Sequence, residues 1–106
     1  MTAGNDQPQR VLVVADRSGL DRLLQRRFSQ VEVICCQSYL SAIVEAAAQP
    51  VRAIVAAVDG RCWRLGEAVR ALREVTQQAR VVLCCEPAFE PLARQGLAAG
   101  ADDYLI

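Results

Sequence analysis

The chain has 106 residues, of which 53 % are hydrophobic, and its twelve basic and twelve acidic side chains cancel; this length fits one domain with its own core. Because no block of like charge interrupts the balance, the composition argues against a nucleic-acid surface and a polybasic membrane patch, both of which need positive potential. Histidine is absent, which removes Ser-His and Cys-His nucleophile pairs and the commonest zinc sites.

The amino-terminal part is predicted to be a tail, a buried strand and a helix. Residues 1–8 are polar and lack the hydrophobic region of a signal peptide, so we expect a disordered tail and a cytoplasmic protein. RVLVVAD, residues 10–16, is nearly continuous in Val and Leu, as in a strand covered on both faces. Ser18 and Asp21 have the spacing of a helix start. The helix then presents apolar residues at helical spacing: Leu20, Leu23, Leu24 and Phe28.

A second strand and a second helix follow. VEVICC, residues 31–36, is the predicted strand, and the helix runs from about residue 40 to 48, with Pro50 ending it. Its predicted buried stripe consists of Leu40, Ile43, Val44 and Ala47. No apolar run here or elsewhere approaches the roughly 18 to 20 residues of a membrane span.

The carboxyl-terminal half repeats the alternation. A strand over 53–58, a loop over 59–66 and a helix presenting Val69, Leu72 and Val75 precede a fourth strand over 79–85. Glu90 and Pro91 open a fourth helix, Gly100 supplies its left-handed stop, and residues 104–106 begin a fifth strand. This order with short connections predicts an α/β protein with an open parallel sheet and helices on both faces.

The last residues narrow the choice of α/β fold. AAGADDYLI, residues 98–106, resembles the end of a response-regulator receiver domain, where G-A-D-D-Y-[LIV] joins the fourth helix to the fifth strand. The resemblance covers about residues 9–106 and implies a flavodoxin-like, five-stranded sheet of order 2-1-3-4-5. A receiver continues through a fifth helix, which is missing here, so we expect a domain truncated after the fifth strand. An apolar patch near strands one and three would then lie uncovered.

The resemblance also assigns the site residues. In a receiver, an aspartate ending strand three accepts a phosphoryl group from a histidine kinase, and two acids after strand one hold Mg²⁺; a Thr or Ser ends strand four and a Lys ends strand five. Here these positions fall on Ala57 for the acceptor, Ala15 and Asp16 for the acids, Cys85 for the hydroxyl, and just past Ile106 for the Lys. The resemblance therefore implies a degenerate pseudo-receiver, a non-catalytic signalling and interaction module without a cofactor.

Asp59 is the competing acceptor. It lies two residues beyond Ala57, on the same face of the strand but roughly 6 to 7 Å further along. We expect Asp59, followed by Gly60, to form a turn. The first alternative is a genuine phosphoacceptor receiver that uses Asp59, with Mg²⁺ at Asp16. The second is a small-molecule-binding flavodoxin-like module, which is disfavoured because ADRSGLD after strand one has a single glycine.

The cysteines and two aromatic residues complete the candidates. Without an export signal, a disulfide scaffold is not expected, and the pairs Cys35-Cys36 and Cys84-Cys85 are expected to be small buried hydrophobes. Cys62 lies in the loop beside Arg61 and Arg64 and is the candidate reactive thiol, against the simpler case of an incidental exposed cysteine. Trp63, in the same loop, either packs over the third helix or anchors a protein contact. By the resemblance, Tyr104 belongs to an interaction surface of the fourth helix and fifth strand, for a protein partner, a carboxyl-terminal output domain or a second copy.

Overall fold

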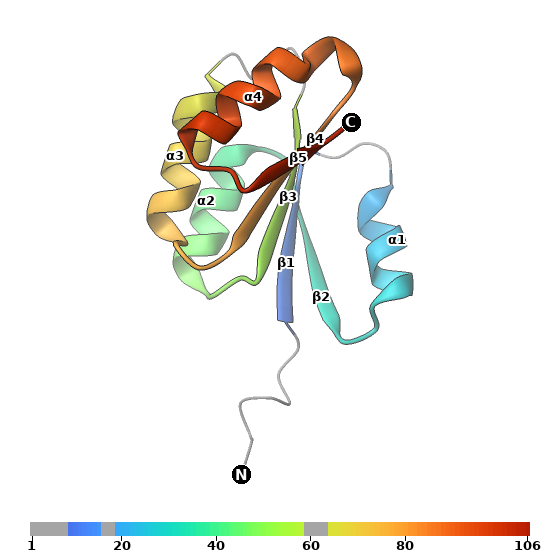
Figure 1. Cartoon of the computed structure of the whole chain (residues 1–106). Coiled ribbons are helices and arrows are strands. Elements are labelled where there is room, and N and C mark those ends of the chain that lie inside the picture. Colours follow the sequence, from blue (N-terminus) through green and yellow to red (C-terminus); the bar gives the residue numbers. More distant parts are fainter. Residues whose placement is uncertain (1–8, 16–18, 59–63) are drawn as a thin grey trace.

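A computed structural model of the chain describes residues 9–15, 19–58 and 64–106. Its strands form one parallel sheet in the order β2-β1-β3-β4-β5 (Figure 1). The strands are β1 (Gln9–Val14), β2 (Val31–Cys36), β3 (Ala53–Val58), β4 (Arg80–Cys85) and β5 (Asp103–Leu105). The helices are α1 (Leu20–Arg27), α2 (Tyr39–Ala48), α3 (Leu65–Val75) and α4 (Glu90–Ala99), with a short 3₁₀ helix η2 (Pro87–Phe89) before α4. The predicted fold class is confirmed.

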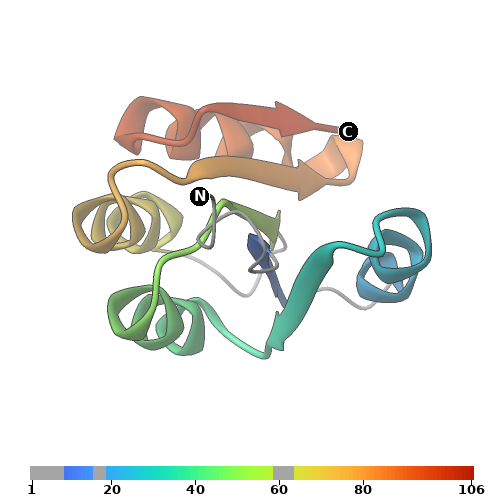
Figure 2. The same ribbon diagram turned by 90° about the horizontal axis from the view of Figure 1, so that it is seen from below.

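The helices divide unequally between the two faces of the sheet. Seen along the strands, α2, α3 and α4 lie on one face, whereas α1 lies on the other, beside β2 (Figure 2). No helix in the described parts of the chain combines the length and the apolar character that crossing a bilayer requires.

The core lies between the sheet and the three-helix layer. In β3, Ile54, Ala56 and Val58 are buried, while the alternate residues Ala53, Val55 and Ala57 are only partly buried. This alternation follows because successive strand residues point to opposite faces. On the less covered face, Val82 and Cys84 of β4 are also partly exposed, but Val13 of β1 is buried. The partly exposed apolar surface thus lies over β3 and β4 and includes Val11 of β1.

The predicted buried stripe of α2 is wrong in three of its four positions. Leu40 and Val44 are 70 % and 61 % exposed, and Ala47 is also exposed, whereas Ile43 packs against the core. The buried face of α2 instead consists of Tyr39, Ala42 and Ala46. Small side chains allow a helix to approach a sheet closely, so the alanines, and not the largest aliphatic residues, occupy the interface.

Helix α1 also differs from its prediction. Its amino-terminal cap is Gly19, with φ 85° and no side-chain cap, while Ser18 lies outside the described residues. The Asp21 carboxylate accepts a hydrogen bond from Cys35 Sγ at 3.0 Å, which links α1 to β2. Leu23 and Phe28 are exposed. Only part of the predicted apolar stripe therefore packs on the sheet. In α3, the predicted Val69 and Leu72 are buried together with Leu65, whereas the predicted Val75 is exposed.

Candidate functional site

The topology places the candidate site at the carboxyl ends of β1 and β3. The order β2-β1-β3-β4-β5 reverses direction between these two strands, and ligands of open α/β sheets bind at such a switch point. Val14 pairs with Ala56, so Ala15 and Ala57 are the next residues along the two strands. Both side chains are methyl groups, so neither offers a carboxylate or a hydroxyl at the carboxyl ends of β1 and β3.

The backbone at Ala57 is held by a buried tyrosine. Tyr39, at the start of α2, is 9 % exposed, and its hydroxyl donates to the Ala57 carbonyl oxygen at 2.8 Å. The cap of α2 orients this residue, because the Ser38 side chain accepts from Ser41 N at 3.1 Å and sets where the helix begins. The carbonyl at the predicted acceptor position is thus satisfied within the fold.

Ala15 adopts a backbone conformation that non-glycine residues rarely use. Its φ is 57°, in the left-handed region, and its N–H donates to the Cys36 carbonyl at 2.8 Å. For an alanine this conformation costs about 1 kcal/mol or more, so the surrounding bonds must enforce it. It turns the chain out of β1 directly before Asp16. Asp16, Asp59, Cys62 and Trp63 all lie outside the described residues, and their roles stay predictions.

Cys85 lies on β4, next to the strand of Ala57, but its side chain is not on the same face of the sheet as that of Ala57. The register pairs Ala57 with Cys84 and Val58 with Cys85, so the side chains of Ala57 and Cys85 point to opposite faces of the sheet. Burial raises the pKa of the Cys85 thiol, and the negative charge of Glu90 raises it further. Cys85 is therefore a neutral thiol at pH 7, a weak hydrogen-bond donor in the place that the resemblance gives to a hydroxyl.

The described residues contain no group of three or more His, Cys, Asp or Glu side chains that could hold a metal ion. Asp21, an acid that follows β1 in the chain, is bonded to Cys35. This hydrogen bond lowers the pKa of Asp21.

Tyr104 connects β5 to α4. Its hydroxyl donates to Glu90 Oε2 at 2.7 Å, and the same oxygen lies 3.2 Å from Arg94 Nη2. The Tyr104 hydrogen bond, followed by the charge of Arg94, lowers the pKa of Glu90. The sequence analysis selected Tyr104 but not Glu90. The spacing of Glu90 and Arg94, four residues apart on one helix, was the available signal for this cluster.

The turn into β5 is organised by Arg73 of α3. Its guanidinium donates to the carbonyls of Gly100 and Ala79 and to Asp102 Oδ2, and Asp102 Oδ2 also accepts from Val81 N. The Val81 N–H, followed by Arg73, lowers the pKa of Asp102. Asp103 also bonds locally, because its Oδ1 accepts from Tyr104 N at 2.8 Å. Sequence reasoning missed Arg73, which no motif marked.

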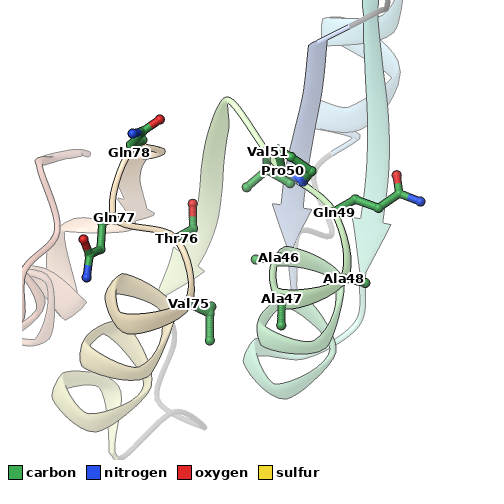
Figure 3. A pocket seen from close by; sticks show the side chains of 10 residues that line it. All are labelled: Ala46, Ala47, Ala48, Gln49, Pro50, Val51, Val75, Thr76, Gln77 and Gln78. Atoms are coloured by element: carbon green, nitrogen blue, oxygen red, sulfur yellow. The ribbon is translucent and has the colours of Figure 1, made fainter.

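Two grooves on the described part of the chain include neither Ala15 nor Ala57 in their lining. The first, of about 340 Å³, lies between the carboxyl-terminal ends of α2 and α3, where Ala46 and Val75 extend into the gap (Figure 3). It is at the opposite end of the sheet from Ala57. The second, of about 550 Å³, runs beside β2 and is lined by Cys35, Cys36, Gln37, Leu40, Ser41, Val44 and Glu45.

This chain is similar to known proteins in its three-dimensional structure, whereas the two comparisons of its sequence find no match. A scan against models of protein families finds no match, and neither does a search of the curated proteins. Among solved structures, a response regulator from Burkholderia pseudomallei with a phosphorylated aspartic acid, calcium ion and citrate is 23 % identical, with a TM-score of 0.75 over 92 % of this chain. This chain spans 58 % of the length of that protein.

Two further structures extend the likeness. The receiver domain of the TMAO respiratory system response regulator TorR is 25 % identical, with a TM-score of 0.75 over 92 % of this chain and 82 % of that one. An adenylate cyclase from Rhodopirellula baltica is 20 % identical, with a TM-score of 0.74 over 92 % of this chain and 75 % of that one. The chain has the fold of response-regulator receiver domains, and the resemblance noted in its sequence is confirmed at that level.

Proposed function

We propose that this receiver-like domain is a non-catalytic, cytoplasmic signalling module that acts by protein contact and is not switched by phosphorylation of an aspartate. One observation carries the proposal: Ala57, at the end of β3, has a methyl group where a receiver has its acceptor carboxylate. The Tyr39 hydroxyl, 2.8 Å from the Ala57 carbonyl oxygen, supports it further, because it ties this strand end into the core.

The chemistry of phosphoryl transfer explains why the substitution matters. An acceptor needs a carboxylate nucleophile, and the transferring group needs a cation held by converging oxygen ligands. Ala15 and Ala57 supply no such oxygen at the ends of β1 and β3. Cys85, with its raised thiol pKa, is a poor substitute for a phosphate-binding hydroxyl.

The proposed contact surface is formed by α4 and β5. Glu90, Arg94 and Tyr104 form a hydrogen-bonded cluster there, with the side chain of Arg94 mostly exposed. Leu105 and Ile106 are exposed hydrophobic residues beside it. An aromatic residue and an arginine next to apolar side chains are typical of protein contact sites. The partner would be another protein or an output domain of the same polypeptide.

The test combines intact-mass measurement and ¹⁵N NMR of the domain with Mg²⁺ and acetyl phosphate or beryllofluoride. We expect no added mass and no shift of the amides near Ala57. Addition of one phosphoryl group would overturn the proposal. If Asp59→Asn abolished that addition and the control Asp103→Asn retained it, the protein would be a phosphorylated receiver with its acceptor at Asp59. An effect of Asp16→Asn on the Mg²⁺ requirement would then place the metal.

A further inference from the structure

Strand β2 forms an edge of the sheet that lacks the usual protection. Within the described residues it pairs with β1 only. Natural edge strands usually carry free charges, prolines or bulges that prevent pairing with another chain. The single charged residue of β2, Glu32, is engaged by Arg10 at 3.5 Å within the same molecule. Arg10 therefore offsets part of the charge that Glu32 presents to a further strand.

The backbone direction shows which groups an added strand would meet. Ala15 N donates to the Cys36 carbonyl, so Cys36 turns its peptide groups toward β1. Alternate residues of a parallel strand bond to the same side. Val33, in the middle of β2, accordingly turns its N–H and carbonyl toward the open edge. An edge with both donors and acceptors can pair with a copy of itself.

Helix α2 adds an apolar surface beside this edge. Among the residues that the structure describes, the most exposed large hydrophobic side chains are Leu40, Ile106 and Val44, and Leu40 and Val44 lie one helical turn apart. The one charged residue of α2, Glu45, lies 3.2 Å from the same Arg10, so one cation serves both Glu32 and Glu45 and one net negative charge remains among the three side chains. The groove of about 550 Å³ between α2 and β2 is open along this stripe. An exposed apolar helix face next to an open strand edge is typical of a surface that another chain covers.

We infer that a second copy of this chain docks here, with β2 antiparallel to its counterpart across a two-fold axis. Such pairing joins the two sheets into one and places both copies of α2 on the same face. Leu40 and Val44 of each copy then meet their equivalents. On the opposite face α1 exposes Leu23 beside the same strand. The two-fold arrangement is favoured because the exposed residues Leu40 and Val44 are apolar and an open strand edge with both donors and acceptors is complementary to itself.

The size of the surface sets the strength of the contact. A six-residue strand is roughly 20 Å long and a ten-residue helix roughly 15 Å, so a footprint about 20 Å wide covers on the order of 400 Å² of each copy. This is about half of the roughly 800 Å² per partner in a stable complex. The dimer is therefore weak and concentration-dependent, with half-association expected in the range of about 10 µM to 1 mM. This inference is independent of the proposed function, whose contact surface lies at the other edge of the sheet.

The experiment is sedimentation equilibrium of the domain across that concentration range, with ¹⁵N NMR of the same samples. We expect a monomer–dimer equilibrium, with concentration-dependent shifts confined to the amides of β2 and α2. The double variant Leu40→Glu/Val44→Glu should raise the dissociation constant at least about tenfold, because it brings four carboxylates together at the axis. Val75→Glu, at an exposed residue of α3, is the matched control and should leave it unchanged.

A backbone variant tests the strand pairing separately. Val33→Pro removes one outward N–H and leaves the bonds to β1, so it should remain folded by circular dichroism and remain monomeric. A monomer at about 1 mM would overturn the inference. A dimer unaffected by Leu40→Glu/Val44→Glu would also overturn it, as would a dimer abolished by Leu105→Glu with shifts in α4 and β5. The last result would place the contact on the proposed functional surface instead.

Discussion

Replacing Arg73 with alanine is expected to be among the most damaging single changes in the chain. The side chain joins α3 to two other segments. Its Nε and Nη2 donate to the Gly100 carbonyl at 3.1 and 2.9 Å, Nη1 donates to the Ala79 carbonyl at 2.8 Å, and Nη2 contacts Asp102 Oδ2 at 2.7 Å. The variant removes these bonds together and leaves the two carbonyls without this donor.

The expected loss follows from the exposure of each group. The Arg73 and Asp102 side chains are 24 % and 37 % exposed, so the ion pair itself is discounted to about 1 kcal/mol or less. The two carbonyl bonds come from a charged donor in a partly buried site and contribute about 1 kcal/mol each after competition with water. The stem of Arg73 also packs beside Gly100. We expect the free energy of unfolding to fall by about 2 to 3 kcal/mol, which lowers Tm by roughly 10 to 15 °C.

Urea unfolding followed by circular dichroism measures this change. Arg73→Lys should recover less than half of the loss, because all three donors of an ammonium group lie on one nitrogen, whereas the bonds of Arg73 come from three separate nitrogens of the planar guanidinium. Arg94→Ala, which removes a mostly exposed arginine paired with Glu90, is the control and should leave the urea midpoint nearly unchanged. The reasoning is refuted if Arg73→Ala stays within about 0.5 kcal/mol of the original protein, or if Arg73→Lys restores it fully.

Three further changes test other contacts. The Val81 N–H and Arg73 hold the pKa of Asp102 below its unfolded value of about 3.9. The ionised carboxylate therefore stabilises the fold above that pH, and this stabilisation is lost as the pH falls through the lower folded pKa. Asp102→Asn should make the free energy of unfolding less dependent on pH in this acidic range, and an unchanged slope below about pH 4 would contradict this. Gly96→Val should lower the free energy of unfolding in urea by about 2 to 3 kcal/mol, because even a Cβ at this position would overlap Leu83 of β4. Gly66→Ala is the control: its Cβ would make only ordinary contacts, so the change should be neutral or stabilising by up to about 1 kcal/mol. Tyr39→Phe should cost about 1 kcal/mol and speed amide exchange at the end of β3; equal exchange in both proteins would show that the hydroxyl does not hold that strand.

Local patterns were sufficient for the order of the elements. The bounds of β2 and β3 match their predictions, because short, mainly apolar runs rich in β-branched residues are typical of strands. The face of α2 was predicted wrongly, since hydrophobicity favours Leu40 and Val44, while close packing on the sheet favours Ala42 and Ala46. The start of α1 was misassigned because a glycine in the left-handed region took the place of the serine cap.

The sequence by itself determined the alternation of strands and helices, the absence of histidine chemistry, and the alanine at the end of β3. These depend on residue identity and on spacings of two to four residues along the chain. Only the tertiary structure decided that Tyr39 bonds the carbonyl of Ala57 and that Arg73 bonds Asp102, across 18 and 29 residues of sequence. It also decided that Ala57 lies beside Cys84 and not Cys85. The physical reason is that such contacts form only after strand register and helix packing have brought distant segments together, and a slip of one residue in register would exchange the side chains on each face.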